Sequence, residues 1–155
     1  LLAELDRSAS PYYFMSSLAS LAEHEEKTDE ALAWRRKAYE VAEGNATRFQ
    51  WGVNYVRAMV RLQPEDHESI AATATSLFDN LEGTHDVFIG RNYRYLRSLV
   101  GELRTWDEDQ ARLQAFDALL EDLCGAQQPA STGAQHCDSL LPDNQKDRQQ
   151  DASGA

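Results

Sequence analysis

Apolar side chains recur every three or four residues along most of this chain, and turn-forming residues separate the periodic segments. A helix that buries one face has this spacing, because each of its turns holds 3.6 residues. The pattern therefore predicts an all-α fold of about six helices. They are expected at about 12–25, 29–43, 46–62, 65–81, 86–104 and 107–124.

Residues that suit helix ends mark several of these boundaries. Ser10 is a good N-cap, and Pro11 fits the first helical position, where its missing N–H costs nothing. Gly44 can take the left-handed conformation that ends a helix. Asp107 with Gln110 resembles a capping box, so we expect the sixth helix to begin there.

The segment 46–62 is apolar over most of its circumference. A helix of this kind is covered on more than one side, so we expect it at the centre of the domain. Its polar residues form one narrow stripe, which consists of Gln50, Asn54, Arg57 and Arg61.

Length and composition predict how the chain is divided. We expect residues 1–9 to be the remnant of an upstream element or linker, in a piece of a longer protein. Residues 10–124 should form the helical-repeat domain. Few large apolar side chains follow Gly125, so most of residues 125–155 is expected to be a disordered, flexible C-terminal tail. Local docking of Leu140-Leu141-Pro142 is the alternative, and a Cys124–Cys137 bridge would hold this segment near the helix at 107–124.

Charge and hydropathy exclude some partners. The net charge of −11 argues against nucleic acid as a partner. No run of the sequence reaches the ~20 apolar residues that cross a bilayer, so we expect no membrane insertion.

Two cysteines, Cys124 and Cys137, are present without a Cys-x-x-Cys spacing. This excludes the usual dithiol redox motif and a four-thiolate zinc site. A disulfide between them would stabilise the fold by about 3 kcal/mol in an oxidising compartment, and two free thiols are the alternative. The histidines lack metal-binding spacing, so neither a metal nor another cofactor is expected.

Basic and amide residues recur on the first helices of the expected hairpins. In stacked helical hairpins the first helices line the concave surface, so these residues predict a groove. The predicted groove contains Tyr13, Ser16, Ser20, Gln50, Asn54, Arg57, Arg61, Arg91, Arg94 and Arg97. Arginine forks bind carboxylates at two points, which favours an acidic peptide or a chain terminus as the ligand. The alternative is a solvated face whose arginines pair with surrounding acids.

Arg35 and Arg48 fall within the apolar arcs of their helices. A buried arginine needs a partner, so we expect an internal ion pair or a hydrogen bond to helix-end carbonyls. A charge that faces a ligand is the alternative.

The order of helices also resembles the tetratricopeptide repeat. Gly52 lies about 33 residues after Ala19, within Trp51-Gly52-x-x-Tyr55, which is similar to the Leu-Gly-x-x-Tyr core of that repeat. The resemblance implies three antiparallel hairpins in a right-handed superhelical stack. Arg35 departs from the repeat, which usually has an aromatic residue there, and an irregular helical bundle is the alternative.

A narrower resemblance is carried by Pro11-Tyr12-Tyr13-Phe14-Met15 and Ala46-Thr47-Arg48-Phe49-Gln50-Trp51-Gly52. Together these segments are similar to the helical C-terminal region of bacterial thioredoxin-family proteins, which are described as thiol:disulfide interchange proteins. The resemblance covers residues 1–124 and implies an upstream redox domain and a periplasmic location. The family's catalytic Cys-x-x-Cys has no counterpart in this sequence.

These observations favour a non-catalytic protein–protein interaction module. Its groove would bind a client peptide or dock on the chain's own upstream thioredoxin-fold domain. One alternative is the specificity lobe of a thiol:disulfide oxidoreductase or isomerase whose catalytic domain lies outside this sequence. Another is a dimerising helical array that uses the exposed side of the helix at 107–124.

Overall fold

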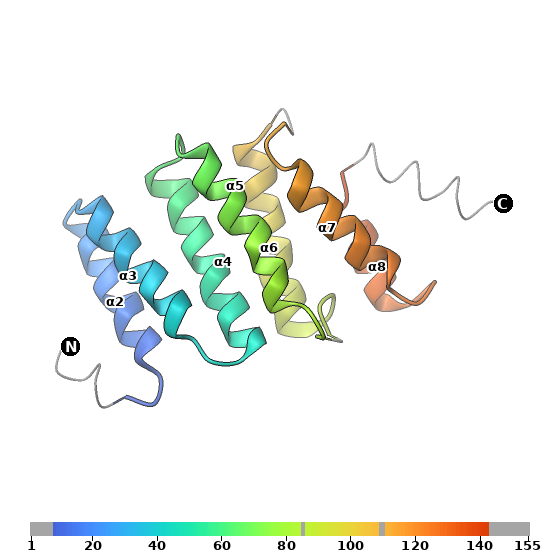
Figure 1. Ribbon diagram of the computed structural model, residues 1–155, viewed down its shortest axis with the longest axis horizontal. Helices are drawn as coiled ribbons and strands as arrows, with labels where there is room; N and C mark the ends of the chain where they lie inside the picture. The colour runs from blue at the N-terminus through green and yellow to red at the C-terminus, as the bar shows by residue number, and fades with distance from the viewer. Residues whose placement is uncertain (1–7, 85, 109–110, 143–155) are drawn as a thin grey trace. The chain divides into compact units, whose positions relative to one another are not determined.

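The computed structural model describes residues 8–84, 86–108 and 111–142 of the chain. Within these ranges the regular secondary structure is all helical, with no strand, which confirms the predicted all-α class. Its α-helices are α2 (Pro11–His24), α3 (Thr28–Val41), α4 (Asn45–Leu62), α5 (His67–Ser76), α6 (Gly90–Trp106), α7 (Gln114–Gly125) and α8 (Thr132–Asp138), with the 3₁₀ helix η1 at Leu77–Asn80 (Figure 1).

The chain consists of two compact units, Leu1–Thr84 and His85–Ala155. The first contains α2 to η1, and the second contains α6 to α8. The division falls inside the stretch 10–124, which the sequence predicts to be one domain.

In the first unit, each helix packs against the next one along the chain (Figure 1). One core cluster joins α2, α3 and α4 through Met15, Ala38, Ala42 and Trp51. Ala38 and Ala42 have small side chains, so the indole of Trp51 can pack against them. Burial of these apolar side chains stabilises the three-helix packing.

At Gly52, α3 and η1 approach α4 closely. A Cβ placed at this position would overlap the side chain of Leu77 and would lie 3.0 Å from Cε2 of Tyr39. The glycine in the Trp51-Gly52-x-x-Tyr55 segment therefore has a packing role, since it admits α3 and η1 against α4.

Two contacts bring the matching ends of α2 and α4 together. Near their N-termini, the ring of Tyr13 meets Trp51 edge-on, with centroids 5.5 Å apart. Near their C-termini, Arg61 donates to the carboxylate of Glu23 over 2.7 Å. These contacts show that α2 and α4 run in the same direction.

In the second unit, α6 begins later than the periodicity predicts. The sequence pattern favours helix from residue 86, whereas Val87 and Phe88 are buried outside any helix and α6 starts at Gly90. Val87 and Phe88 contribute to the core although they lie outside a helix. Apolar periodicity alone does not distinguish buried residues in a loop from buried residues in a helix.

The predicted start of the sixth helix at Asp107 is also wrong. Asp107 is the C-cap of α6, and its fully buried carboxylate accepts hydrogen bonds from the backbone N–H and the Nη1 of Arg112, at 2.8 and 3.0 Å. Asp107 thus holds the loop that follows α6, and α7 begins only at Gln114. Gln110, the other residue of the predicted capping box, lies outside the described residues.

The prediction of a disordered tail from residue 125 is wrong for residues 125–142. This stretch contains α8, and a disulfide joins Cys137 of α8 to Cys124 of α7. Leu140 and Leu141, which follow α8, are both buried. The burial of Leu140 and Leu141 and the disulfide hold this segment in the second unit. The overall composition of residues 125–142, which is poor in large apolar side chains, does not indicate this. Residues 143–155 of the predicted tail, and residues 1–7, lie outside the described residues.

Candidate functional site

A polar network in the first unit uses several residues of the predicted groove. Its centre is Glu23, whose side chain is only 19% exposed. One carboxylate oxygen accepts from Nε and Nη2 of Arg35, at 3.2 and 3.0 Å, and the other accepts from Arg61. Arg35 also donates to the hydroxyls of Ser16, at 2.8 Å, and Ser20, at 3.2 Å.

This network sets the charge state of Glu23. Burial by itself raises the pKa of Glu23. Hydrogen bonds from Arg61 and Arg35 and their positive charges together lower this pKa by more than burial raises it, so the net shift is downward. The carboxylate therefore stays ionised at neutral pH and links α2 to both α3 and α4.

The network assigns internal partners to three predicted groove residues, Ser16, Ser20 and Arg61. It also confirms the internal ion pair expected for Arg35. Arg48 is exposed, so its expected burial is wrong, although its Nε donates to the helix-end carbonyl of Ala42 over 3.1 Å.

The other groove residues of the first unit lie on α2 and α4. Tyr13 is 59% exposed, and its ring packs against Trp51. Gln50, Asn54 and Arg57 are partly buried on α4. Their role in binding stays a prediction.

The second unit carries the most exposed part of the predicted groove. Arg91, Arg94 and Arg97 lie at intervals of three residues on α6, and all three are exposed. None of them forms an ion pair within the described part of the chain. We call these three residues the arginine edge.

The position of the arginine edge gives the helix no electrostatic benefit. A helix dipole favours cations near the C-terminus and anions near the N-terminus. Arg91 and Arg94 lie in the first two turns of α6, whose first turn has no acidic residue. Arg91 and Arg94 therefore gain no stabilisation from the helix dipole.

A hollow of about 690 Å³ lies beside Arg97 in the second unit. Its apolar lining consists of Val100, Gly101, Leu140, Leu141 and Pro142. Its polar lining consists of Tyr93, Arg97, Arg104, Gln135, His136 and Ser139. An apolar surface beside a few polar groups is typical of a ligand site.

The two arginines of the hollow differ in what they can bind. Arg104 makes two hydrogen bonds to the carboxylate of Asp117 on α7, one of them 3.0 Å long. Arg97 has no such internal partner among the described residues. Arg97 is therefore the cation of the hollow that remains for a ligand.

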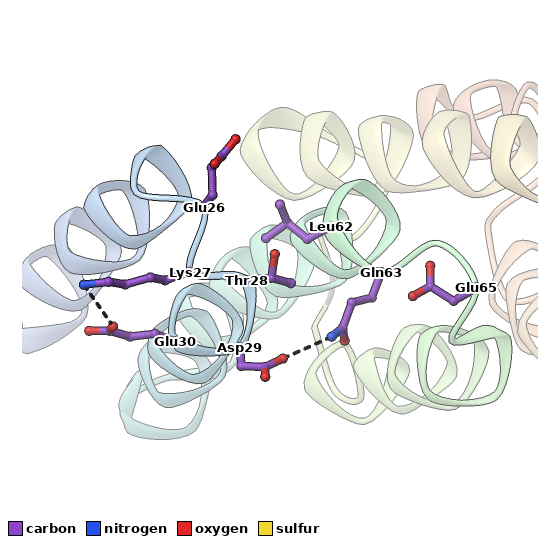
Figure 2. Close-up of a pocket in the computed structure, with 8 residues that line it drawn as sticks. All are labelled: Glu26, Lys27, Thr28, Asp29, Glu30, Leu62, Gln63 and Glu65. Carbon is purple, nitrogen blue, oxygen red and sulfur yellow. Dashed lines mark hydrogen bonds and ion pairs between the residues drawn. The ribbon is translucent and has the colours of Figure 1, made fainter.

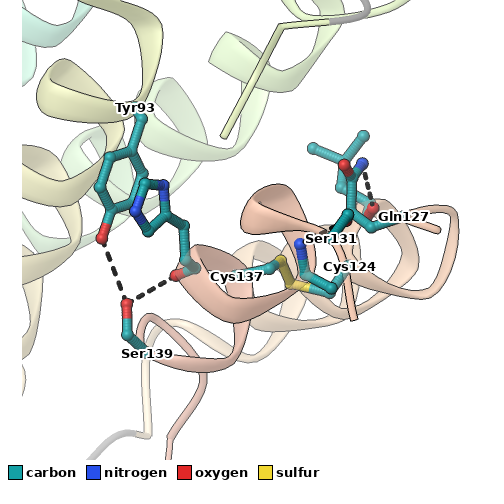
Figure 3. The surroundings of a disulfide bond; sticks show 9 residues. Tyr93, Cys124, Gln127, Ser131, Cys137 and Ser139 are labelled. Atoms are coloured by element: carbon teal, nitrogen blue, oxygen red, sulfur yellow. Dashed lines mark hydrogen bonds between the residues drawn. A yellow bond between two sulfur atoms is a disulfide. The ribbon is translucent and has the colours of Figure 1, made fainter. Parts of the chain in front are cut away.

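One wall of the hollow is a stack of Tyr93 and His136. Their rings are nearly parallel, with centroids 4.1 Å apart. Nδ1 of His136 lies 2.7 Å from the carbonyl oxygen of Phe88, and because a carbonyl only accepts, Nδ1 carries the hydrogen. Ser139 lies 3.3 Å from the hydroxyl of Tyr93 and donates to the carbonyl of His136 over 2.6 Å (Figure 3).

Sequence reasoning missed this wall, because it leaves His136 in a disordered tail. The pair is 43 positions apart, and no local spacing signals it. The Leu140-Leu141-Pro142 segment is the one local signal that the chain beyond α7 docks on something. The sequence therefore indicates that residues 140–142 pack against another element, but it does not indicate that they lie beside α6.

A second hollow, of about 590 Å³, lies in the first unit (Figure 2). Its lining consists of Glu26, Lys27, Thr28, Asp29, Glu30, Leu62, Gln63 and Glu65. Gln63 donates to the carboxylate of Asp29 over 3.3 Å, and Lys27 lies 4.0 Å from Glu30. Four acidic side chains against one lysine repel the acidic ligand that the groove predicts, so this hollow is not the expected site.

Within the described residues, no group of histidine, cysteine, aspartate or glutamate side chains could hold a metal ion. No helix in that part of the chain combines the length and the apolar character needed to cross a bilayer. No protein-family model, curated protein or solved structure matches the chain. The resemblance to thioredoxin-family proteins accordingly remains an expectation based on two short segments.

Proposed function

We propose that this chain is a non-catalytic interaction module whose second unit binds an acidic peptide segment of a client protein. One observation carries the proposal. In a chain with a net charge of −11, three exposed arginines lie at three-residue intervals on α6 without internal ion pairs, and Arg97 borders a partly apolar hollow. The charge complementarity is between this edge and carboxylate groups.

The geometry of α6 sets the size of the peptide. Six residues separate Arg91 from Arg97, which corresponds to about 9 Å along a helix axis. An extended peptide advances about 3.3 Å per residue, so the edge matches three to four residues. We therefore infer a short segment with two or more acidic side chains.

The hollow supplies a place for an apolar side chain of the same peptide. Val100, Leu140 and Leu141 form its apolar surface, and Arg97 lies at the same hollow. A carboxylate bound by Arg97 would place a neighbouring apolar residue of the peptide near these side chains. The preferred ligand thus combines acidic residues with one bulky apolar residue.

The wider arrangement that we propose is a tetratricopeptide-like stack of antiparallel hairpins. Its support comes from the first unit, where consecutive helices pack, α2 and α4 run in the same direction, and Gly52 admits its neighbours. The peptide site, however, rests on α6 and the hollow, because Arg61 of the predicted groove is bound to Glu23.

The alternative, a specificity lobe of a thiol:disulfide oxidoreductase, gains no support from the cysteines. Cys124 and Cys137 are bonded to each other and buried, so neither is a free nucleophile. A periplasmic location and an upstream redox domain remain proposals that follow from the sequence resemblance alone.

The test is fluorescence anisotropy with a labelled peptide that alternates glutamate with a single leucine. Arg97→Gln should weaken binding by about tenfold or more, because a charge-assisted hydrogen bond is worth about 1.5–3 kcal/mol. Arg36→Gln is the matched control, since it removes the same charge from an exposed α3 residue that pairs with Glu40. The affinity of the Arg36→Gln variant for the peptide should stay within about twofold of the wild-type affinity.

Salt provides a second readout. Binding through the arginine edge should weaken as ionic strength rises, because salt screens exposed charges. The proposal is wrong if the wild-type chain does not bind the peptide at low salt, or if Arg36→Gln loses as much affinity as Arg97→Gln.

A further inference from the structure

Resting on this proposed function, we propose that the Cys124–Cys137 disulfide controls the peptide site, because it holds in place the helix that completes the hollow. The oxidised chain would present both the arginine edge and the hollow. The reduced chain would keep the arginine edge alone.

The helix concerned, α8, is too short to be stable by itself. It has seven residues, and isolated helices shorter than about 12–15 residues are marginal in water. The hydroxyl of Ser131 accepts a hydrogen bond from the N–H of Ala134 and caps its first turn. The stability of α8 must therefore come from what it is attached to.

The disulfide and several noncovalent contacts, including the burial of Leu140 and Leu141, hold α8 and the residues after it in the second unit. The disulfide links Cys137 to Cys124 on α7, with Cα atoms 5.5 Å apart (Figure 3). The ring of His136 stacks on Tyr93 and bonds to the carbonyl of Phe88. The disulfide is the covalent attachment of α8 to α7, whereas the contacts of His136 are noncovalent.

The hollow depends on this helix. More than half of its lining comes from α8 and the residues that follow it, namely Gln135, His136, Ser139, Leu140, Leu141 and Pro142. The arginine edge, in contrast, lies entirely on α6. Release of α8 would remove Leu140, Leu141 and Pro142 from the apolar lining, and it would leave Val100 and the three arginines of α6 in place.

Thiol–disulfide exchange with an external dithiol would release α8. Cys124 is 7% exposed and Cys137 is fully buried, so the attacking thiolate reaches Sγ of Cys124. A mixed disulfide forms there, and the sulfur of Cys137 leaves and takes up a proton. The second thiol of the reductant then attacks the mixed disulfide, and Cys124 leaves as a thiol. The reductant ends as a cyclic disulfide, having supplied two electrons and two protons.

The affinity change follows from the population of docked α8. When a site is complete for only a fraction of the time, its apparent dissociation constant equals the intrinsic one divided by that fraction. If reduction leaves α8 docked about a tenth of the time, the contribution of the hollow falls about tenfold. Peptides that do not use the hollow should not respond.

The experiment measures two labelled peptides against the oxidised and the dithiothreitol-reduced full chain. The first is the acidic peptide with one leucine, and the second has glycine in place of that leucine. The oxidised chain should bind the leucine peptide about tenfold more tightly, since burying one such side chain supplies this factor. In the reduced chain the two affinities should come within about twofold of each other, because α8 is docked only about a tenth of the time, and the affinity for the glycine peptide should be unchanged. Cys124→Ser/Cys137→Ser should behave like the reduced chain whether or not dithiothreitol is present.

Hydrogen exchange separates release of α8 from loss of the whole unit. Reduction should raise exchange in residues 131–142 and leave the amides of α6 protected. The inference is wrong if mass spectrometry shows complete reduction and the leucine peptide still binds equally well, or if α6 also loses protection. If the oxidised chain binds neither peptide, the proposed function itself fails. The two failures are therefore distinguishable.

Discussion

Replacement of Gly52 by alanine tests the packing between α4 and its neighbours. In an unhindered helix this change would stabilise the protein by about 1 kcal/mol, because alanine has the higher helix propensity. At position 52, however, the new Cβ would overlap Leu77 and would lie 3.0 and 3.2 Å from two ring carbons of Tyr39. The outcome therefore depends on whether these two side chains can move.

Both neighbours resist displacement. Leu77 is 1% exposed, so its side chain has no adjacent solvent to enter. The ring of Tyr39 is held at its hydroxyl, which accepts a hydrogen bond from Asn80 over 3.2 Å. Overpacking of a core costs about 1–3 kcal/mol, and two displaced side chains place this site near the upper end. After subtraction of the propensity gain, Gly52→Ala should destabilise the first unit by about 1–2 kcal/mol.

Gly101→Ala is the matched control. Gly101 also lies within a helix, but it is exposed, and a Cβ at this position meets no atom within 4 Å. It should therefore stabilise the second unit by up to about 1 kcal/mol, which is the opposite sign. Urea unfolding followed by circular dichroism and tryptophan fluorescence measures both variants. Trp34 and Trp51 report on the first unit and Trp106 on the second. A Gly52→Ala variant as stable as the wild type would refute the close approach of these helices.

Two further predictions concern the ion pairs. The pKa of Glu23 is lowered from its ordinary value of 4.5 on folding, so its stabilising effect should be complete above that value and should be lost as the pH falls through the lowered folded pKa. The advantage of the wild type over Glu23→Gln in urea midpoint should shrink on acidification, and an advantage that grows would contradict the Arg35–Glu23–Arg61 network. Asp117→Asn should destabilise the second unit by about 2–3 kcal/mol, because it leaves the partly buried Arg104 without its charge partner. A thermal unfolding midpoint unchanged by this substitution would show that the pair contributes little.

Local sequence features predicted α2, α3 and α4 well, whereas the single helix expected at about 65–81 is α5 followed by the 3₁₀ helix η1. The helix at α2 begins after Ser10 at Pro11, and α3 and α4 begin and end within about two residues of their predicted bounds. Caps, glycines and periodic apolar positions act over one or two helical turns, so they can be recognised from neighbouring residues alone. Gly52 could also be singled out from local sequence, because it lies in the Trp51-Gly52-x-x-Tyr55 segment that resembles the repeat core.

Long-range pairing could not be predicted in this way. The sequence placed Ser16, Ser20 and Arg61 in a binding groove, whereas the fold brings them to Arg35 and Glu23. In a chain with 26 acidic residues, many carboxylates are candidate ion-pair partners for any one arginine. Only the packing of α2, α3 and α4 decides which acid lies within reach.

The amino-acid sequence by itself determined that this protein is helical, where its first helices begin and end, and which α6 residues are basic. Tertiary structure decided that α8 exists, that its His136 stacks on Tyr93, and that a hollow lies beside Arg97. The physical reason is the range of the interactions. Helix formation follows from hydrogen bonds and side chains within a few positions of each other, whereas the hollow is formed by residues of α6 and α8 that are distant in the chain and meet only after the fold and the Cys124–Cys137 link have brought them together.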